Sequence, residues 1–215
     1  VPKFSSSNLT LGNVLVILII LPEIKEFVNY VKAQCKAKGV VIKLKPTKNV
    51  KLGEIKCSGY FDEIDKELVV SAKHESALET LVHEFAHFTQ WIEDCPAWKA
   101  SASTYGNIDE WLGGKDFRYI KKYVALARDL ELDNEKRSVK LIKKFKLPID
   151  VKLYIKKANA YVLFYNYMLI TRRWCKPNNS PSRNPILLAE CSDKFDMRYD
   201  KLSDDILDAF ILAKI

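Results

Sequence analysis

The pentapeptide His83-Glu84-Phe85-Ala86-His87 is the feature that most limits how this 215-residue chain can fold. The chain contains only three histidines, and two of them stand four residues apart in this segment. On a helix, that spacing places both imidazoles on one face, where they can bind a single zinc ion. The intervening Glu84 is then beside the metal and can act as a general base. The sequence therefore predicts a helix that carries part of a metal site.

The residues around the pentapeptide predict an amphipathic helix with a buried face. Ser76 and Glu79 have the spacing of a capping box, in which the serine caps the helix start and the glutamate bonds back to it. An apolar face runs through the motif and consists of Ala77, Leu78, Leu81, Val82, Phe85, Ala86 and Phe88. A histidine beside such a face is costly unless it has a partner, which favours a bound metal. The alternative is a core helix with two histidines at this spacing by coincidence.

A zinc site needs a third protein ligand, and the sequence favours a carboxylate. No histidine occurs between residues 88 and 100, and His74 stands before the expected helix start. Residues 116–145 predict one long helix, because they are rich in Lys, Arg, Leu, Ala and Glu and lack Pro and Gly. Glu131 and Glu135 interrupt its stripe of apolar or small residues, which otherwise consists of Ile120, Val124, Ala127, Ser138 and Ile142.

These two acids are expected to face a cation or strong hydrogen-bond donors, because burying a carboxylate without a partner is expensive. We assign Glu131 as the third metal ligand. Glu135, one turn later, is assigned as a residue that orients a ligand histidine. The alternative is that both acids pair with Lys or Arg neighbours at a helix edge.

The HEFAH motif, followed by Glu-Leu-Asp-Asn-Glu at residues 131–135, resembles the gluzincin pattern of zinc peptidases. In that pattern, HExxH is followed on a later helix by Glu-x-x-x-Asp or a near relative, and small peptidases of the ImmA/IrrE type are similar. The resemblance covers residues 22–145. The sequence is also similar in general pattern to small HExxH proteins encoded by tailed phages. It implies that Glu131 binds zinc and that Glu135, where Asp or Asn is more usual, supports a histidine.

The order of the predicted elements favours an α+β, mostly helical zincin-like fold with a small mixed β-sheet before the motif helix. A helix is predicted over residues 22–38, followed by strands over 40–44, 55–61 and 67–72. Residues 68–72 are expected to line the substrate cleft, where an extended peptide can add by backbone hydrogen bonding. Residues 94–115 contain three glycines and a proline and are expected to form a loop-rich cleft wall.

No linker divides the chain, so we expect one domain over residues 1–215. Its expected parts are an apolar N-terminal extension (1–21), a peptidase core (22–145) and a helical C-terminal part (146–215) with helices over 151–173 and 203–213. The apolar run 14–21 is too short to span a bilayer, so no transmembrane span is expected.

The predicted ligand set indicates hydrolytic chemistry. Two histidines and a glutamate leave one zinc position for water, which is typical of a catalytic site. Zinc lowers the pKa of that water, and Glu84 is expected to take its proton and pass it to the leaving amine. The candidates for stabilising the oxyanion are Tyr105, Tyr161, Tyr165 and His74. The sequence thus predicts a zinc-dependent peptidase that acts on a protein or peptide substrate.

The composition adds expectations about partners and compartment. The net charge is +8, and lysines and arginines crowd residues 136–157, predicted here as a basic helix that can bind an acidic partner or nucleic acid. Five cysteines without a CxxC pair favour free thiols in a reducing compartment, and the protein is expected to be cytoplasmic or virion-associated. Two other functions stay open: a retired zincin-fold protein with a structural or assembly role, for instance in a virion, and a basic nucleic-acid-associated protein.

Overall fold

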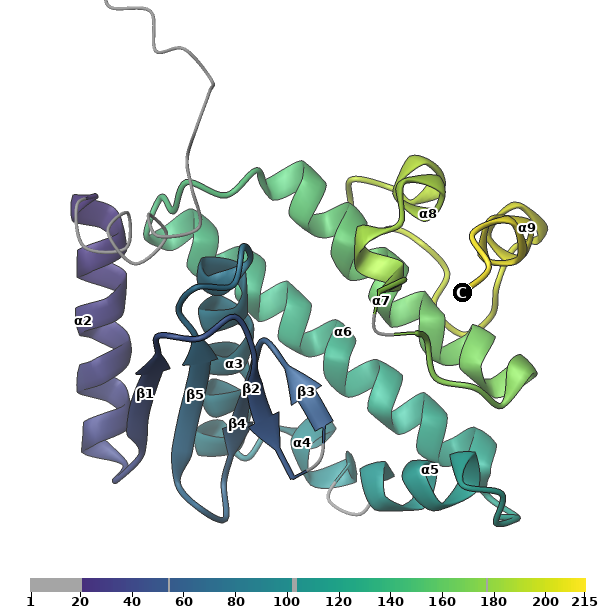
Figure 1. Ribbon diagram of the computed structural model, residues 1–215, viewed down its shortest axis with the longest axis horizontal. Coiled ribbons are helices and arrows are strands. Elements are labelled where there is room, and N and C mark those ends of the chain that lie inside the picture. The colour runs from purple at the N-terminus through teal and green to yellow at the C-terminus, as the bar shows by residue number, and fades with distance from the viewer. Residues whose placement is uncertain (1–20, 54, 102–103, 177) are drawn as a thin grey trace, which may run out of the picture. The chain divides into compact units, whose positions relative to one another are not determined.

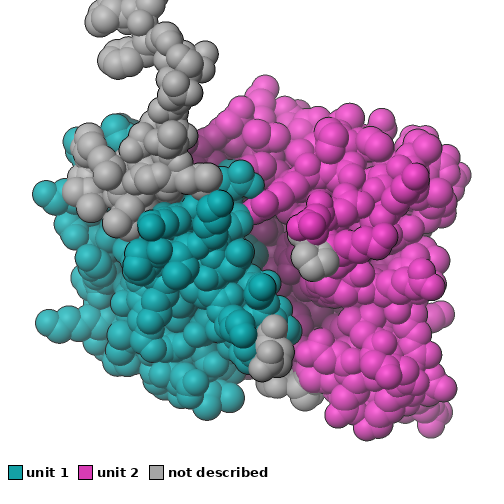
Figure 2. Space-filling view, in the orientation of Figure 1, with its two compact units in different colours: residues 1–89, 144–147 teal, residues 90–143, 148–215 magenta. Residues whose placement is uncertain are grey.

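The computed structural model describes residues 21–53, 55–101, 104–176 and 178–215. The fold is α+β, with helices as the main element and a small mixed sheet before the motif helix (Figure 1). The chain divides into two compact units, residues 1–89 with 144–147 and residues 90–143 with 148–215 (Figure 2). The apolar extension predicted for residues 1–21 lies outside the described residues except for Leu21.

The first unit includes α2 (Pro22–Ala37), which buries one face. Pro22 occupies the first helical position, where the N–H that proline lacks would have no partner within the helix. Gly39, with a φ of 72°, follows the helix end and lets the chain turn toward the first strand. The buried residues of α2 are three or four positions apart and are Ile24, Phe27, Val31 and Cys35. The predicted helix over residues 22–38 is confirmed.

The sheet of the first unit has three strands in the order β1-β5-β4. β1 (Val41–Lys45) is parallel to β5 (Glu67–Ser71), whereas β4 (Gly59–Asp62) is antiparallel to β5. Leu68, Val69 and Val70 of β5 are all buried, as is typical of a central strand that is covered on both faces. A separate antiparallel hairpin joins β2 (Val50–Leu52) to β3 (Ile55–Cys57).

The central position of β5 corrects the prediction that residues 68–72 accept a substrate peptide. Both edges of β5 are paired, one with β1 and the other with β4, so an added peptide has no backbone edge there. β4 ends the strand order, and its Phe61 packs edge-on against Phe88 of α3 (Ala77–Glu93), with ring centroids 5.8 Å apart. The single strand predicted over residues 55–61 is two strands, β3 and β4, in different sheets.

The described residues of the second unit form helices and the segments that connect them, with no strand among them. This unit holds the end of α3, α4 (Pro96–Ser101), α5 (Thr104–Leu112), most of α6 (Ile120–Lys144), α7 (Val151–Thr171), the 3-10 turn η1 (Pro181–Arg183), α8 (Pro185–Glu190) and α9 (Asp204–Leu212). Two helix starts are capped by side chains. The Asp150 carboxylate accepts from the N–H groups of Lys152 and Leu153, and the Ser203 hydroxyl accepts from the N–H of Ile206.

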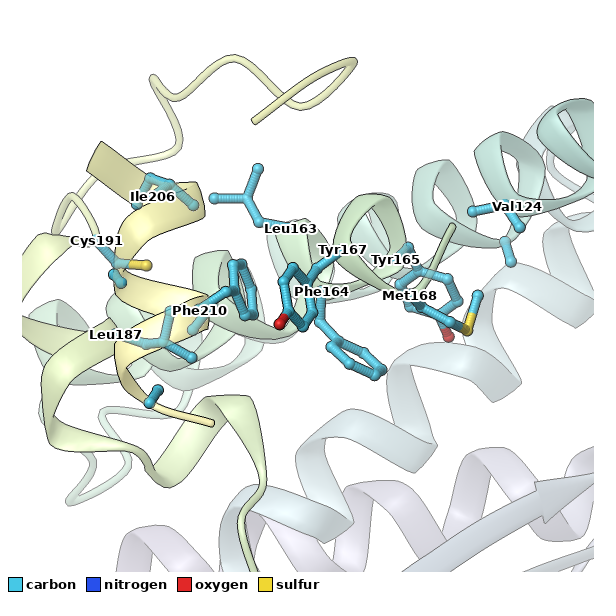
Figure 3. Packing of buried hydrophobic residues seen from close by; sticks show 14 of the residues in the cluster. Val124, Leu163, Phe164, Tyr165, Tyr167, Met168, Leu187, Cys191, Ile206 and Phe210 are labelled. Carbon is cyan, nitrogen blue, oxygen red and sulfur yellow. The ribbon is translucent and has the colours of Figure 1, made fainter. Parts of the chain in front are cut away.

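α7 is at the centre of the core of the second unit. From Ala158 to Met168 every residue except Tyr161 is buried, so this helix is covered on nearly all sides. Phe210 of α9 stacks on Tyr167 with ring centroids 4.7 Å apart, and Leu187 of α8 belongs to the same cluster (Figure 3). The two short C-terminal helices are therefore held by apolar contacts with α7.

The prediction of a loop-rich wall over residues 94–115 is wrong, because α4 and α5 occupy most of this segment. The buried face of α5 includes Ile108 and Trp111, which are three residues apart and so lie on one side of a helix. Gly113 and Gly114, which favoured a loop, follow the last residue of α5. They mark the helix end and do not interrupt the helix.

The basic stretch 136–157 is not one helix. α6 ends at Lys144, and α7 begins at Val151. Pro148 stands between them, and a proline disfavours helical backbone at the residue before it. The lysines of this stretch are therefore divided between two helices, which corrects the predicted basic helix.

The structure also bears on the cysteines and on the membrane. All five cysteines are free thiols, and Cys35, Cys95 and Cys191 are buried. Among the described residues, none of the helices is both long enough and apolar enough to cross a membrane.

Candidate metal centre

Both motif histidines lie on α3, which continues without a break through the pentapeptide. The imidazole ring centroids of His83 and His87 are 4.8 Å apart, and the ring planes are at 85° to each other. Both residues are half-buried. On the apolar side of the same helix, Phe85 contacts Phe27 of α2 with ring centroids 6.1 Å apart. The predicted helix is confirmed, and it presents both histidines as neighbours.

Glu131 brings a carboxylate to these histidines. It lies on α6 and is only 4% exposed. One ligand atom from each of His83, His87 and Glu131 lies within 4.8 Å of the other two. This cluster could hold a metal ion. Its donors are two imidazole nitrogens and one carboxylate oxygen, a set that suits several divalent transition metals.

Gln90, which our sequence reasoning did not single out, fixes the turn of α6 that carries Glu131. Its side chain is fully buried. The amide Nε2 donates to the carbonyl oxygen of Leu130 at 3.0 Å and to Oδ2 of Asp133 at 2.8 Å. Because Leu130 directly precedes Glu131, this contact holds the backbone from which the carboxylate extends. The sequence does contain a signal for this role, because Gln90 is four positions after Ala86 and is therefore a polar residue on the apolar face of α3.

Three tyrosines gather around Glu131. Tyr105 of α5 donates its hydroxyl to Oε1 of Glu131 at 2.7 Å. Tyr161 and Tyr165 are one turn apart on α7, and their hydroxyl oxygens are 3.3 Å apart. Burial raises the pKa of each of the three hydroxyls above its usual range, and the negative charge of Glu131 raises it further. The three predicted oxyanion stabilisers are thus neutral phenols placed around a candidate metal ligand.

His74, the fourth predicted oxyanion stabiliser, lies at the start of α3. Its Nδ1 is 2.8 Å from Oγ of Ser76, and Ser76 directly precedes the first helical residue. His83 is seven positions after Ser76 along the helix, which corresponds to a rise of about 10 Å. The structure therefore places His74 with the serine at the helix start and apart from the ligand cluster.

Glu135 is one turn after Glu131 on α6 and is 6% exposed. Its negative charge contributes to the raised pKa of Tyr161, so the two side chains are near each other. The contact with a ligand histidine, which the sequence assigned to Glu135, stays a prediction.

Glu84 is 9% exposed and lies against β4. A Cβ atom added at Gly59 of β4 would be 3.5 Å from Cγ of Glu84. It would also be 2.6 Å from Cγ2 of Thr80 and 2.6 Å from the carbonyl oxygen of Val69. Burial, and then the charge of Glu84, raises the pKa of the half-buried Cys57 thiol at the end of β3. The predicted base therefore lies where α3 packs against β4.

Replacing Gly59 with alanine is expected to destabilise the protein by about 1–3 kcal/mol, because the new methyl group overpacks this contact. The carbonyl of Val69 belongs to the backbone and cannot rotate away as a side chain can. Urea unfolding monitored by circular dichroism measures the change. Gly106→Ala is the control, since a Cβ there meets nothing within 4 Å, and alanine is favoured over glycine in a helix. Equal stability of Gly59→Ala and wild type would contradict the close approach.

Comparison with known proteins does not identify a family for this chain. No family model matches the chain, and no curated protein or solved structure shows significant similarity to it. Inferences about function therefore rest on the sequence pattern and on the geometry of these side chains.

Proposed function

We propose that this protein is a zinc-dependent peptidase of the gluzincin type with a zincin-like core. The observation that carries the proposal is the cluster of His83, His87 and Glu131, whose ligand atoms lie within 4.8 Å of one another. Two separate sequence features selected these residues: the spacing of the histidines and the acid that interrupts the apolar stripe of a distant helix. Their convergence supports a metal site and argues against a core helix that carries two histidines by coincidence.

The chemistry of the proposal follows from the ligands and from Glu84. Zinc, when bound, lowers the pKa of a water ligand and polarises a carbonyl group. Two histidines and one glutamate are a ligand set of catalytic zinc sites, which keep one position open. Glu84, next to His83 in sequence, would accept a proton from the attacking water and transfer it to the leaving amine. A site that only joins two helices has no use for this base.

The substrate of the proposed peptidase is a protein or peptide that binds in an extended form. β4 takes the role that the sequence gave to residues 68–72, because it ends the strand order and lies against Glu84 through Gly59. An extended peptide could pair with the outer edge of β4 by backbone hydrogen bonds. Such pairing would bring a peptide bond close to the proposed base.

Elemental analysis of the wild type, His83→Ala and His74→Ala, purified without added metal, tests this function. We expect about one zinc ion per chain in the wild type and much less in His83→Ala, because two protein ligands do not complete a zinc site. His74→Ala is the matched control, since it removes the histidine that lies apart from the cluster. We also expect the wild type to cleave members of a library of internally quenched peptides, and we expect a chelator to stop this cleavage until zinc is added back.

The possible results separate the proposed function from its alternatives. A wild type that binds no zinc even when zinc is offered would exclude the peptidase. Zinc that is bound through His83 without cleavage of any library member would indicate the structural or assembly role. Equal zinc loss in His83→Ala and His74→Ala would show that the cluster is not the zinc site.

A further inference from the structure

The hydrogen bond between Tyr105 and Glu131 indicates a role for Tyr105 that the sequence did not predict. Glu131 is 4% exposed, and a buried carboxylate is unfavourable unless it accepts hydrogen bonds or contacts a cation. The Tyr105 hydroxyl meets part of this need, because its oxygen is 2.7 Å from Oε1 of Glu131. This distance is typical of a hydroxyl group that donates to an oxygen atom.

The position of Tyr105 suits its hydroxyl group to donate a hydrogen bond to Glu131. The residue is 41% exposed overall, yet its hydroxyl reaches the buried carboxylate on α6. A phenol keeps its proton at neutral pH, because the usual pKa of a tyrosine hydroxyl is about 10.

The helix that carries Tyr105 is itself fixed in place. Ile108 and Trp111 of α5 are buried in the core of the second unit. The carbonyl oxygen of Trp111 accepts from Nε of Arg172, at the end of α7, at 2.9 Å. Because α5 is anchored at both its apolar face and its end, it can hold the Tyr105 hydroxyl at a constant position.

We propose that Tyr105 is a positioning residue that orients the Glu131 carboxylate for metal binding. This inference rests on the proposed function, because it takes Glu131 as a ligand. A carboxylate has two oxygens, so a hydrogen bond to one of them limits rotation of the group. The carboxylate can still bind an ion through its other oxygen. The partner of a metal ligand fixes its orientation in the same way that a carboxylate fixes a ligand histidine.

The same hydrogen bond argues against Tyr105 as an oxyanion stabiliser. A phenol has one hydroxyl proton, and Tyr105 donates it to Glu131. It cannot donate that proton to a substrate oxyanion while this bond holds. The two roles therefore predict different results for the same substitution, since positioning acts on metal affinity without substrate and oxyanion stabilisation acts on kcat.

The test is the zinc affinity of Tyr105→Phe, measured without substrate by competition with a chromophoric chelator. We expect the affinity to fall by roughly 10- to 100-fold, the usual effect of removing a partner of a metal ligand. Tyr119→Phe, the same change at a tyrosine that is 56% exposed, is the matched control and should bind zinc like the wild type. The visible spectrum of the cobalt-substituted protein should change in Tyr105→Phe and stay the same in the control.

The results keep the inference separate from the function on which it rests. If the wild type binds zinc and Tyr105→Phe binds it equally well, the positioning role is excluded while the peptidase proposal stands. If kcat falls in Tyr105→Phe but zinc affinity and the cobalt spectrum are unchanged, Tyr105 acts on the reaction and the inference is wrong. If the wild type binds no zinc, both proposals fail. Because the substitution removes a single oxygen atom, circular dichroism should show an unchanged fold.

Discussion

The Glu84→Gln variant is expected to hydrolyse peptides with a kcat/KM about 100- to 10,000-fold below that of the wild type, the usual range for losing a general acid–base group. Glutamine has nearly the same shape but cannot accept the proton of a metal-bound water. Glu84 is not part of the ligand cluster of His83, His87 and Glu131, so zinc affinity should change little. The measurement is kcat/KM on a cleaved library peptide, with zinc content determined on the same samples.

A second glutamate on α3 provides the control for this substitution. Glu93 is exposed at the end of the helix and forms an ion pair with Arg137 at 2.5 Å. Such surface ion pairs contribute little to the stability of the fold. Glu93→Gln should therefore keep the activity of the wild type. If Glu84→Gln stays active with its zinc intact, another group supplies the base. If it loses zinc, Glu84 contributes to metal binding and the assigned division between ligands and base is wrong.

The parts of the fold that the sequence predicted are those decided by local pattern. Helix α2 has apolar residues at helical spacing, a proline at its start and a glycine after its end, so local rules sufficed. The motif helix and the long helix α6 were predicted for the same reason. For α6, the two acids within an apolar stripe also identified the residues to examine, and both are buried.

The neighbours of each strand could not be predicted, because strand pairing depends on contacts between distant residues. The run Leu68-Val69-Val70 is apolar on both faces, which is compatible with a central strand and with a strand beside a cleft. Only the pairing of β1 and β4 with β5 decides between them. The close approach of α3 to Gly59 is likewise invisible in the sequence, where this glycine resembles a turn residue.

The surroundings of Glu131 were beyond sequence reasoning for the same reason. Tyr105 was included among the possible oxyanion stabilisers, but its hydrogen bond to Glu131 depends on how α5 and α6 pack. Gln90 was overlooked because an isolated glutamine on a helix is usually a surface residue. Its burial and its two hydrogen bonds to α6 appear only once the helices are placed together.

Replacing Glu131 with glutamine is expected to weaken zinc binding by more than about 100-fold, which exceeds the cost of losing a residue that only supports a ligand. A neutral amide is a poor zinc ligand, whereas ionised carboxylate oxygen is a common one. The amide oxygen can still accept the hydrogen bond from Tyr105, so the packing around position 131 should be kept. Competition with a chromophoric chelator measures the affinity.

Glu135→Gln is the matched comparison, because Glu135 lies on the same helix and is buried to a similar degree, 6% against 4% exposed. Removing either charge relieves a similar desolvation cost in the metal-free protein, so urea unfolding without zinc should change similarly in both variants. The two variants should then differ only in zinc affinity. If Glu135 supports a ligand histidine, its replacement should cost roughly 10- to 100-fold. A larger loss in Glu135→Gln than in Glu131→Gln would reverse the two assignments and make Glu135 the ligand.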